Sequence, residues 1–262
     1  MRIPLYQVDA FTSHLFRGNP AAICPLDQWL ADEVLQSIAA ENNLSETAYY
    51  IRNGKGYQLR WFTPGVEVDL CGHATLASAH VIFSIRRETA DSRVSFQSKS
   101  GELIVEREGD LYALDFPSRP AAECAVDAGL DEALGAKPEV ILGARDYLCV
   151  FETEEQVRAL APNMDKLAAI DRFAFIVTAP GRDCDFVSRF FAPAKGVPED
   201  PVTGSAHCTL IPYWSKRLGK TSLHARQISK RGGELFCEDR GERVRIAGRA
   251  VKFLEGQIEL AD

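Results

Sequence analysis

The fold is decided by a stretch that occurs twice, first as RWFTPGVEVDLCGHATLASAHVI at residues 60–82. The second copy, RFFAPAKGVPEDPVTGSAHCTLIPYW, spans residues 189–214. Each copy runs arginine, aromatic, phenylalanine, any residue and proline, and then reaches a glycine before an alanine-rich apolar run. Gly72 corresponds to Gly204 if the second loop is three residues longer. The repeat predicts two related domains, each with a strand, a loop and the N-terminus of a buried helix.

The composition is that of an ordinary globular protein and excludes several function classes. The 262 residues are 46% hydrophobic with a net charge of −7, enough for one large or two small cores and without the basic balance of a nucleic-acid binder. No apolar run approaches the roughly 18 residues of a membrane span, and no signal-peptide pattern follows the N-terminus. Seven widely spaced cysteines without C-x-x-C indicate neither a disulfide framework nor a zinc knuckle. We expect a cytoplasmic enzyme or binding protein that contacts neither nucleic acid nor membrane.

Local signals outside the repeat predict helix starts and a domain junction. Asp27 can cap a helix that runs through Ile38 and stops near Asn42. Thr153 precedes a helix with Gln156 in the capping-box position. Proline and alanine cluster at residues 117–123, where we expect one domain to end.

Two related domains are expected to bring two helix N-termini to an interdomain cleft. A helix N-terminus offers unpaired N–H groups and a partial positive charge, which favour small carboxylates or phosphates. Gly72 and Gly204 would let a ligand approach the backbone closely. The alternative is that these glycines only permit the turn.

Cys71 is the first reactive residue at these helix starts. A cysteine before a helix can have a lowered pKa and act as a base. Racemases that use two thiols need one on each side of the substrate carbon, and the matched position here is Thr203. Packing or an accessory role is the alternative for Cys71. Cys71 and His73 as metal ligands would need partners at zinc-like spacing, which the sequence lacks, so we expect no metal.

Two carboxylates are better placed for proton transfer. Glu46 lies where a helix ends and a strand begins, beside apolar residues that would partly desolvate it. Asp200 precedes Pro201, which restricts its backbone. Ser205 and His73 each follow a helix-start glycine and could bind a carboxylate or carry a proton. The alternatives are an exposed loop glutamate for Glu46 and a turn or capping aspartate for Asp200.

At these residues the sequence resembles a known family. The stretches DAFTSHLFRGNPAAIC (9–24), NLSETAYY (43–50), LRWFTPGVEVDLCGHATLASAHVIF (59–83) and EDPVTGSAHC (199–208) are similar to the phenazine-biosynthesis PhzF-like proteins, in the branch that writes LCGHAT. The resemblance spans nearly the whole chain. The four motifs, in order and correctly spaced, are specific as a set.

The resemblance implies the diaminopimelate-epimerase fold, of class α+β. Two pseudo-symmetric domains each wrap a curved β-sheet, nearly a barrel, round a central helix, and such proteins are commonly homodimers. The final strand, KFLEGQIEL, would return to the first domain. We therefore expect an N-terminal domain of residues 1–117 and 252–262 and a C-terminal domain of residues 118–251.

The resemblance also implies a cofactor-independent isomerase that moves a proton within a small carboxylate-bearing substrate. By motif, the catalytic residues are Glu46, His73 and Asp200, and the substrate-binding residues are Asn19, Ser45, Gly72, Gly204 and Ser205. The chain departs from epimerase and racemase relatives, which carry a cysteine in each domain, because only Cys71 is kept. The alternatives are a Cys71-dependent epimerase or racemase and a non-enzymatic protein that binds a ligand or partner.

Overall fold

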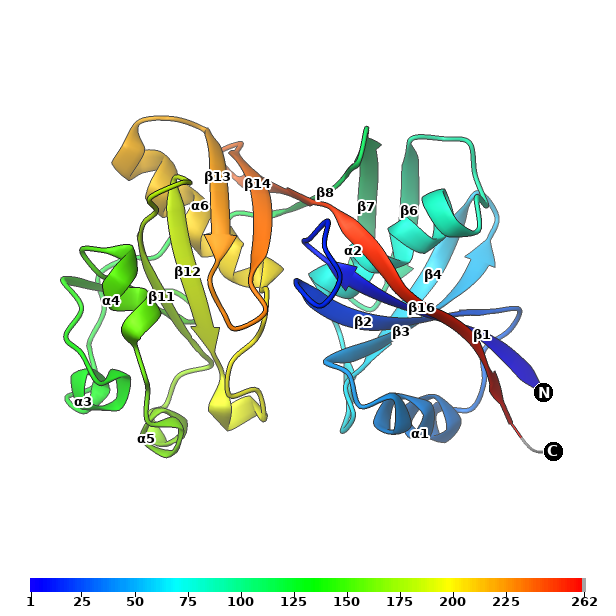
Figure 1. Ribbon diagram of the computed structural model, residues 1–262, viewed down its shortest axis with the longest axis horizontal. Helices are drawn as coiled ribbons and strands as arrows, with labels where there is room; N and C mark the ends of the chain where they lie inside the picture. The colour runs from blue at the N-terminus through cyan, green and yellow to red at the C-terminus, as the bar shows by residue number, and fades with distance from the viewer. Residues whose placement is uncertain (261–262) are drawn as a thin grey trace. The chain divides into compact units, whose positions relative to one another are not determined.

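The computed structural model describes residues 1–260 and divides into two compact units (Figure 1). Unit 1 comprises Met1–Asp115 together with the chain from Ala247 onward, and unit 2 comprises Phe116–Ile246. The chain leaves unit 1 within strand β8 (Leu111–Pro117) and returns within strand β15 (Arg243–Gly248). The unit boundaries therefore precede the expected domain ends, residues 117 and 251, by two and five residues.

Unit 1 is built on one mixed sheet. Its remaining strands are β1 (Arg2–Ala10), β2 (Asn19–Leu26), β3 (Glu46–Asn53), β4 (Gly56–Phe62), β5 (Glu67–Val68), β6 (Arg93–Ser98), β7 (Gly101–Glu108) and β16 (Ala250–Glu259). The order is β16-β1-β2-β3-β4-β6-β7-β8, and β5 pairs with β4. Its helices are α1 (Asp32–Asn42) and α2 (Gly72–His80), which continues as the π-helical turn η1 (Val81–Ile85). The pairing of β16 with β1 confirms that the final strand returns to the first domain.

Unit 2 has the same kind of sheet. Its strands are β9 (Val140–Gly143), β10 (Tyr147–Val150), β11 (Phe175–Pro180), β12 (Phe186–Phe191), β13 (Ser222–Gln227), β14 (Gly233–Asp239) and β15, in the order β15-β14-β13-β12-β11-β10-β9. Its helices are α3 (Leu130–Leu134), α4 (Glu154–Ala159), α5 (Met164–Ala169), the 3-10 turn η2 (Pro193–Lys195) and α6 (Gly204–Leu218).

The two sheets repeat one pairing pattern, which confirms the internal duplication. Along β1-β2-β3-β4-β6-β7 the pairings are antiparallel, parallel, antiparallel, parallel and antiparallel. The series β9-β10-β11-β12-β13-β14 has the same succession. Parallel neighbours need a crossover, and helices supply it at matching places. Helix α1 precedes β3 as α4 and α5 precede β11, and α2 precedes β6 as α6 precedes β13.

A buried helix lies at the centre of each unit. Helix α2 packs against β16, β1, β2, β3 and β7, which include strands near opposite ends of the sheet order. The sheet of unit 1 must therefore curve round α2. In unit 2 the Trp214 ring of α6 stacks on Phe186 at 5.6 Å, and its Nε1 donates to Thr178 Oγ1 at 2.9 Å. The α+β class and the wrapped central helices agree with the sequence-based prediction.

Of the two predicted helix N-caps, the one at Thr153 was right and the one at Asp27 was wrong. Thr153 and Gln156 form the predicted capping box at α4. Asp27, however, does not cap α1, which begins at Asp32 after Ala31 and has no side-chain cap. Within residues 1–260, no helix combines the length and apolar content that a membrane span requires.

Candidate active site

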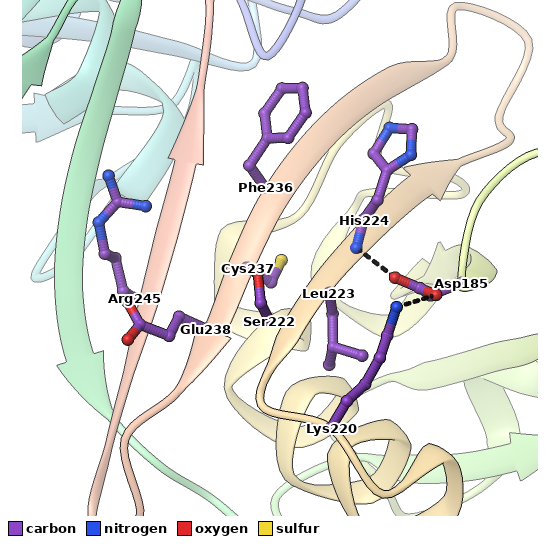
Figure 2. Close-up of a pocket in the computed structure, with 9 residues that line it drawn as sticks. All are labelled: Asp185, Lys220, Ser222, Leu223, His224, Phe236, Cys237, Glu238 and Arg245. Carbon is purple, nitrogen blue, oxygen red and sulfur yellow. Dashed lines mark hydrogen bonds and ion pairs between the residues drawn. The ribbon is translucent and has the colours of Figure 1, made fainter.

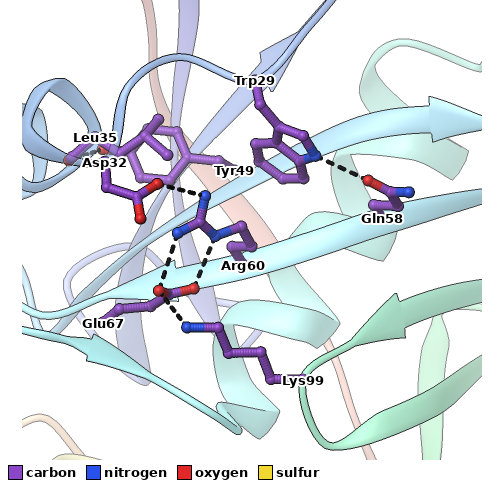
Figure 3. Close-up of polar contacts among 8 residues, drawn as sticks. All are labelled: Trp29, Asp32, Leu35, Tyr49, Gln58, Arg60, Glu67 and Lys99. Atoms are coloured by element: carbon purple, nitrogen blue, oxygen red, sulfur yellow. Dashed lines mark hydrogen bonds and ion pairs between the residues drawn. The ribbon is translucent and has the colours of Figure 1, made fainter.

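An arginine–glutamate pair holds the loop that leads into the central helix of unit 1 (Figure 3). Arg60 donates to Glu67 from Nε and Nη2 at 2.7 and 2.9 Å, and from Nη1 to Asp32 at 2.9 Å. Its guanidinium also lies 5.1 Å from the centre of the Phe62 ring. The hydrogen bonds from Arg60 lower the pKa of Glu67 to about 2, against the opposing effect of burial. Arg60, the first residue of the repeated stretch, therefore fixes the loop before α2 through Glu67.

The same pair recurs before the central helix of unit 2. Arg189 donates to Glu199 from Nε and Nη2 at 2.7 and 3.1 Å. It also donates to the carbonyls of Val157 and Leu160, and its guanidinium lies 4.9 Å from the Phe191 ring. Because Glu199 directly precedes Asp200, this pair fixes the loop that carries the predicted carboxylate.

Helix α2 begins at Gly72, as predicted, and brings three reactive side chains together. Cys71 is the N-cap residue with an extended backbone, and His73 lies in the first turn. Glu46 is the first residue of β3. The His73 Nε2 atom lies 3.2 Å from Glu46 Oε2, and the His73 Nδ1 atom lies 3.5 Å from Cys71 Sγ. The imidazole therefore contacts both a thiol and a carboxylate.

Burial shapes the charges in this cluster. Burial, and secondly the Glu46 carboxylate, raise the pKa of the Cys71 thiol. Burial alone would lower the pKa of His73, but Cys71 and Glu46 outweigh it and hold that pKa well above its usual value. The side chain of Glu46 is 19% exposed and that of His73 only 7%. These directions favour the thiol form of Cys71 and the imidazolium form of His73.

The facing atoms of Glu46 and His73 are close but not well aligned. Although Nε2 and Oε2 are within ion-pair distance, neither forms a directed hydrogen bond with any residue of the described chain. Most buried polar atoms in folded proteins have such a partner. Glu46 Oε2 and His73 Nε2 are therefore exceptions to this rule, and they face each other at one place.

Glu46, Cys71 and His73 also offer donor atoms within 4.8 Å of one another, a set that a metal ion could use. Nδ1 of the imidazole is near the Cys71 thiol and Nε2 is near the Glu46 carboxylate, while the thiol and a carboxylate oxygen are themselves neighbours. The observed geometry is a compact cluster of three reactive side chains.

Helix α6 begins at Gly204, again as predicted, and its N-cap residue is Thr203. The Thr203 hydroxyl donates to Asp200 Oδ2, and the Thr203 N–H donates to Gln227 Oε1 at 2.8 Å. Gln227 Nε2 in turn donates to the carbonyl of Asp200 at 2.8 Å. Thr203 and Gln227 therefore fix Asp200. The sequence pattern missed Gln227, because it lies 24 residues after Thr203 on strand β13.

Ser205, the second residue of α6, has a neighbour that the motifs did not include. Arg145 Nη2 donates to Ser205 Oγ at 3.4 Å across 60 residues of sequence. Arg145 precedes strand β10 and belongs to none of the motifs. A single sequence carries no signal for this contact.

The two remaining predicted residues lie in unit 1 near Glu46. Asn19 is fully buried at the start of β2, and Ser45 is half-buried directly before Glu46. Strand β2 runs parallel to β3 with Ala21 paired to Glu46. Gly18 must be glycine, because its φ is +66° and a Cβ there would lie 2.1 Å from the carbonyl oxygen of Ala10.

A pocket in unit 2 contains none of the predicted site residues (Figure 2). Asp185, Lys220, His224, Phe236 and Arg245 are among the residues that line it. Asp185 is occupied there by the N–H of His224 and by Lys220. This pocket therefore adds no side chain to those predicted for the site.

Comparisons with known proteins show what the chain is similar to. The model of the family described as "Phenazine biosynthesis-like protein" matches residues 8–256. A Pseudomonas aeruginosa protein named as an uncharacterized isomerase is 55% identical over 262 residues, which cover 100% of both chains. A solved Enterococcus faecalis structure of the phenazine biosynthesis protein PhzF family is 47% identical, with a TM-score of 0.97 over 99% of this chain and 100% of that one.

A more distant structure shows likeness of fold alone. The hydroxyproline epimerase from Agrobacterium vitis is 11% identical, with a TM-score of 0.63 over 100% of this chain and 93% of that chain. The shared architecture is the duplicated, helix-centred sheet described above.

Proposed function

The chain belongs to the phenazine biosynthesis-like protein family, and from this we propose that it is an isomerase that moves a proton within a small carboxylate-bearing substrate. The observation that carries the proposal is the close approach of His73 Nε2 to Glu46 Oε2, at 3.2 Å, beside the N-terminus of a buried helix. The name of the 55% identical relative supports the general class of isomerase.

Glu46 is the proposed base and then the proposed acid. Its carboxylate removes a proton from one substrate carbon, and the electron pair left behind delocalises toward the neighbouring unsaturated or carboxylate group. The carboxyl group then exchanges its proton with solvent and delivers a proton to another carbon, so the reaction introduces solvent hydrogen into the substrate. The proposal is supported by the partial exposure of Glu46, which leaves it open to a ligand, and by the unaligned Oε2 atom, which retains an acceptor site.

His73 has the proposed role of an electrostatic assistant. Its raised pKa favours the imidazolium, which stabilises negative charge that develops on the substrate. The unpaired N–H groups at the start of α2 can donate hydrogen bonds to the substrate carboxylate. In unit 2, Asp200 is the proposed second assisting group, and Ser205 with Gly204 is a proposed substrate contact.

The steps transfer only protons, so the proposed reaction needs neither metal nor cofactor. The Cys71-dependent epimerase finds less support. Cys71 is buried, and its raised pKa favours the unreactive thiol. The matched position in unit 2 is Thr203, which carries no thiol. A homodimer and a cytoplasmic location stay predictions, which sedimentation and cell fractionation would check.

Solvent-deuterium exchange tests the proposal. The protein is incubated in heavy water with a panel of small cyclic and acyclic amino and hydroxy acids, and mass spectrometry reports label gained at carbon. We expect label with the native chain and none above background with Glu46→Gln. Glu41→Gln, which changes an exposed glutamate at the end of α1, is the matched control and should retain exchange. Equal exchange by the native chain and Glu46→Gln would refute the mechanism.

A further inference from the structure

Three side chains of unit 1 meet at the start of helix α2 with the donor atoms that a zinc ion prefers. Glu46, Cys71 and His73 offer an oxygen, a sulfur and a nitrogen within 4.8 Å of one another, all inside unit 1. Bonds of about 2.0–2.3 Å put the ligands of one tetrahedral zinc about 3.3–3.8 Å apart. The distance from Cys71 Sγ to His73 Nδ1, 3.5 Å, already lies in that range. A side-chain shift of about 1 Å would therefore complete the ligand set.

The donors that face each other here are not engaged elsewhere. The side chain of His73 is 7% exposed, and its Nε2 atom forms no directed hydrogen bond with any residue of the described chain. The buried Oε2 atom of Glu46 is in the same condition. Burial of a polar atom without a partner costs free energy, and a bond to a metal ion recovers it. No directed bond has to break before either atom turns toward an ion.

Contacts outside the cluster fix the backbone that carries these donors. The carbonyl of Cys71 accepts hydrogen bonds from the Thr75 N–H at 3.2 Å and from the Thr75 hydroxyl at 2.6 Å. Thr47, which directly follows Glu46, accepts at its hydroxyl from Asn42 Nδ2 at 3.1 Å. Metal sites bind well when their ligands are held by such supporting contacts. The cluster is therefore pre-organised to within a side-chain rotation.

The donor types select one class of cation. Sulfur, imidazole and carboxylate ligands suit Zn²⁺, whereas Mg²⁺ and Ca²⁺ prefer sites made of oxygen atoms. The Glu46 side chain is 19% exposed, which gives an ion a path from solvent and leaves a fourth position for water. The sequence spacing argued against a metal because Glu46 comes from strand β3 and not from the segment that carries Cys71 and His73.

We propose that Glu46, Cys71 and His73 form an inhibitory Zn²⁺ site within unit 1. The ion forms one bond each to a carboxylate oxygen, the sulfur and a ring nitrogen. The thiol proton and one imidazolium proton leave to solvent, and no group is oxidised or reduced. Glu46 is then bonded to the ion and unavailable as a base. The binding stands without the proposed function, whereas the inhibition rests on it.

The experiment measures binding directly and does not depend on catalysis. The full chain is treated with a chelator, dialysed and titrated by calorimetry with Zn²⁺ and, separately, with Mg²⁺. The native chain should bind one Zn²⁺ with a Kd on the order of 1 µM or lower and Mg²⁺ at least about 100-fold more weakly. Co²⁺ is the spectroscopic probe, because a Co²⁺–thiolate bond gives a charge-transfer absorption band.

Variants of the three ligands should each weaken the site. Glu46→Gln and His73→Gln should raise the Kd for Zn²⁺ by about 100-fold or more, since even residues that only orient a ligand commonly account for 10–100-fold. Cys71→Ala should also remove the Co²⁺–thiolate band. If Cys71→Ala fails to fold, Glu46→Gln still decides the question, because it keeps the shape of a partly exposed side chain.

Two other cysteines supply matched controls. Cys124 and Cys184 are the half-buried cysteines of the chain and therefore its most accessible thiols. Cys124→Ala and Cys184→Ala should keep both the affinity for Zn²⁺ and the Co²⁺–thiolate band. Loss of the band in either control would move the metal to unit 2 and overturn the inference.

The remaining outcomes separate this inference from the proposed function. No Zn²⁺ binding to the native chain, or equal binding in all three ligand variants, overturns the inference, and Glu46-dependent deuterium exchange found alongside would leave the proposed isomerase intact. Zn²⁺ bound through the three residues without any Glu46-dependent exchange in the panel keeps the metal site and counts against the isomerase. Exchange that continues undiminished at saturating Zn²⁺ overturns the inhibitory role.

Discussion

The starts of helices α2 and α6 share one scaffold and differ in chemistry. In unit 1 the Arg60–Glu67 pair holds the preceding loop, and in unit 2 the Arg189–Glu199 pair does the same. Each guanidinium group also lies over the ring of the phenylalanine two residues later on the same strand. The duplicated sequence thus preserved the contacts that position each helix and left the residues at its first turn free to diverge.

The divergence is clearest in the two helix histidines. In α2, Glu46 and Cys71 raise the pKa of His73 against the effect of burial. In α6, burial lowers the pKa of His207 to about 4, although its Nδ1 atom is bonded to the Thr203 carbonyl at 2.8 Å. The charged imidazole is favoured at one helix start and the neutral imidazole at the other, because only His73 has Cys71 and Glu46 beside its ring.

The largest effect should separate the two carboxylates. We expect Glu46→Gln to slow deuterium exchange about 1,000-fold, within the usual range for loss of an acid–base group, and Asp200→Asn to slow it about tenfold. Asp200 is expected to matter less because Thr203 already donates to its carboxylate. The measurement is the initial rate of label uptake on one substrate. Losses of equal size would indicate two equivalent bases and break the asymmetry.

The second prediction concerns the shared scaffold. Arg189→Met should lower the free energy of unfolding by about 3 kcal/mol and Arg60→Met by about 2 kcal/mol, since each leaves a partly buried glutamate without its main partner. Arg189 has the larger effect because it also bonds two backbone carbonyls. Urea unfolding checks both values. The control is Arg158→Met, whose ion pair with Glu154 is more exposed. A larger loss in Arg60→Met would show that the two pairs are not equivalent.

The third prediction is a pair of opposite pH dependences. Because the folded pKa of His73 is raised, its contribution to the free energy of unfolding is present below about pH 6.5 and lost as pH rises through the folded value. Because the folded pKa of His207 is lowered, its contribution is present above about pH 6.5 and lost as pH falls toward 4. The measurement is the free energy of unfolding of the native chain minus that of each variant, His73→Gln and His207→Gln, across pH 4–9. This difference should fall with rising pH for His73→Gln and rise with rising pH for His207→Gln. Parallel curves would contradict the charge assignment.

The smallest effect should come from the N-cap residues themselves. Cys71→Ala should lower the pKa of His73, since the thiol helps raise it, and should slow exchange by about tenfold or less, the worth of one weak hydrogen bond. Thr203→Val should leave the pKa of His73 unchanged. Histidine ¹⁵N signals followed with pH test both statements. Cys71→Ala as inactive as Glu46→Gln would instead favour the thiol-dependent epimerase.

Sequence patterns predicted this fold wherever the deciding contacts are local or repeated. The two glycines that begin α2 and α6, and the capping box at Thr153, depend on residues within a few positions of each other. The start of α1 was misplaced at Asp27 because it depends on a distant strand. Asp32, its first residue, pairs with Arg60 of β4, 28 residues later. A capping rule cannot include that contact.

In the candidate site, too, the sequence predicted the residues but not the contacts between residues distant in the chain. The motifs named Glu46 and His73, but only the structure puts Nε2 beside Oε2 and shows the thiol beside Nδ1. The motifs also named Ser205 and gave no indication of Arg145, because the strand order alone brings it to the start of α6. The unpredicted contribution of Gln227 to Asp200 has the same origin.

The sequence by itself determined the duplicated α+β architecture, the buried helices and the residue types at their first turns. Those features follow from apolar periodicity, turn chemistry and a repeat, which are properties of short segments. The tertiary structure alone decided which side chains meet, and therefore that one helix start carries a carboxylate–imidazole pair while the other carries an arginine beside a serine. Charge state and hydrogen bonding depend on distance and burial, and those quantities exist only once the strands have paired and the helices are enclosed.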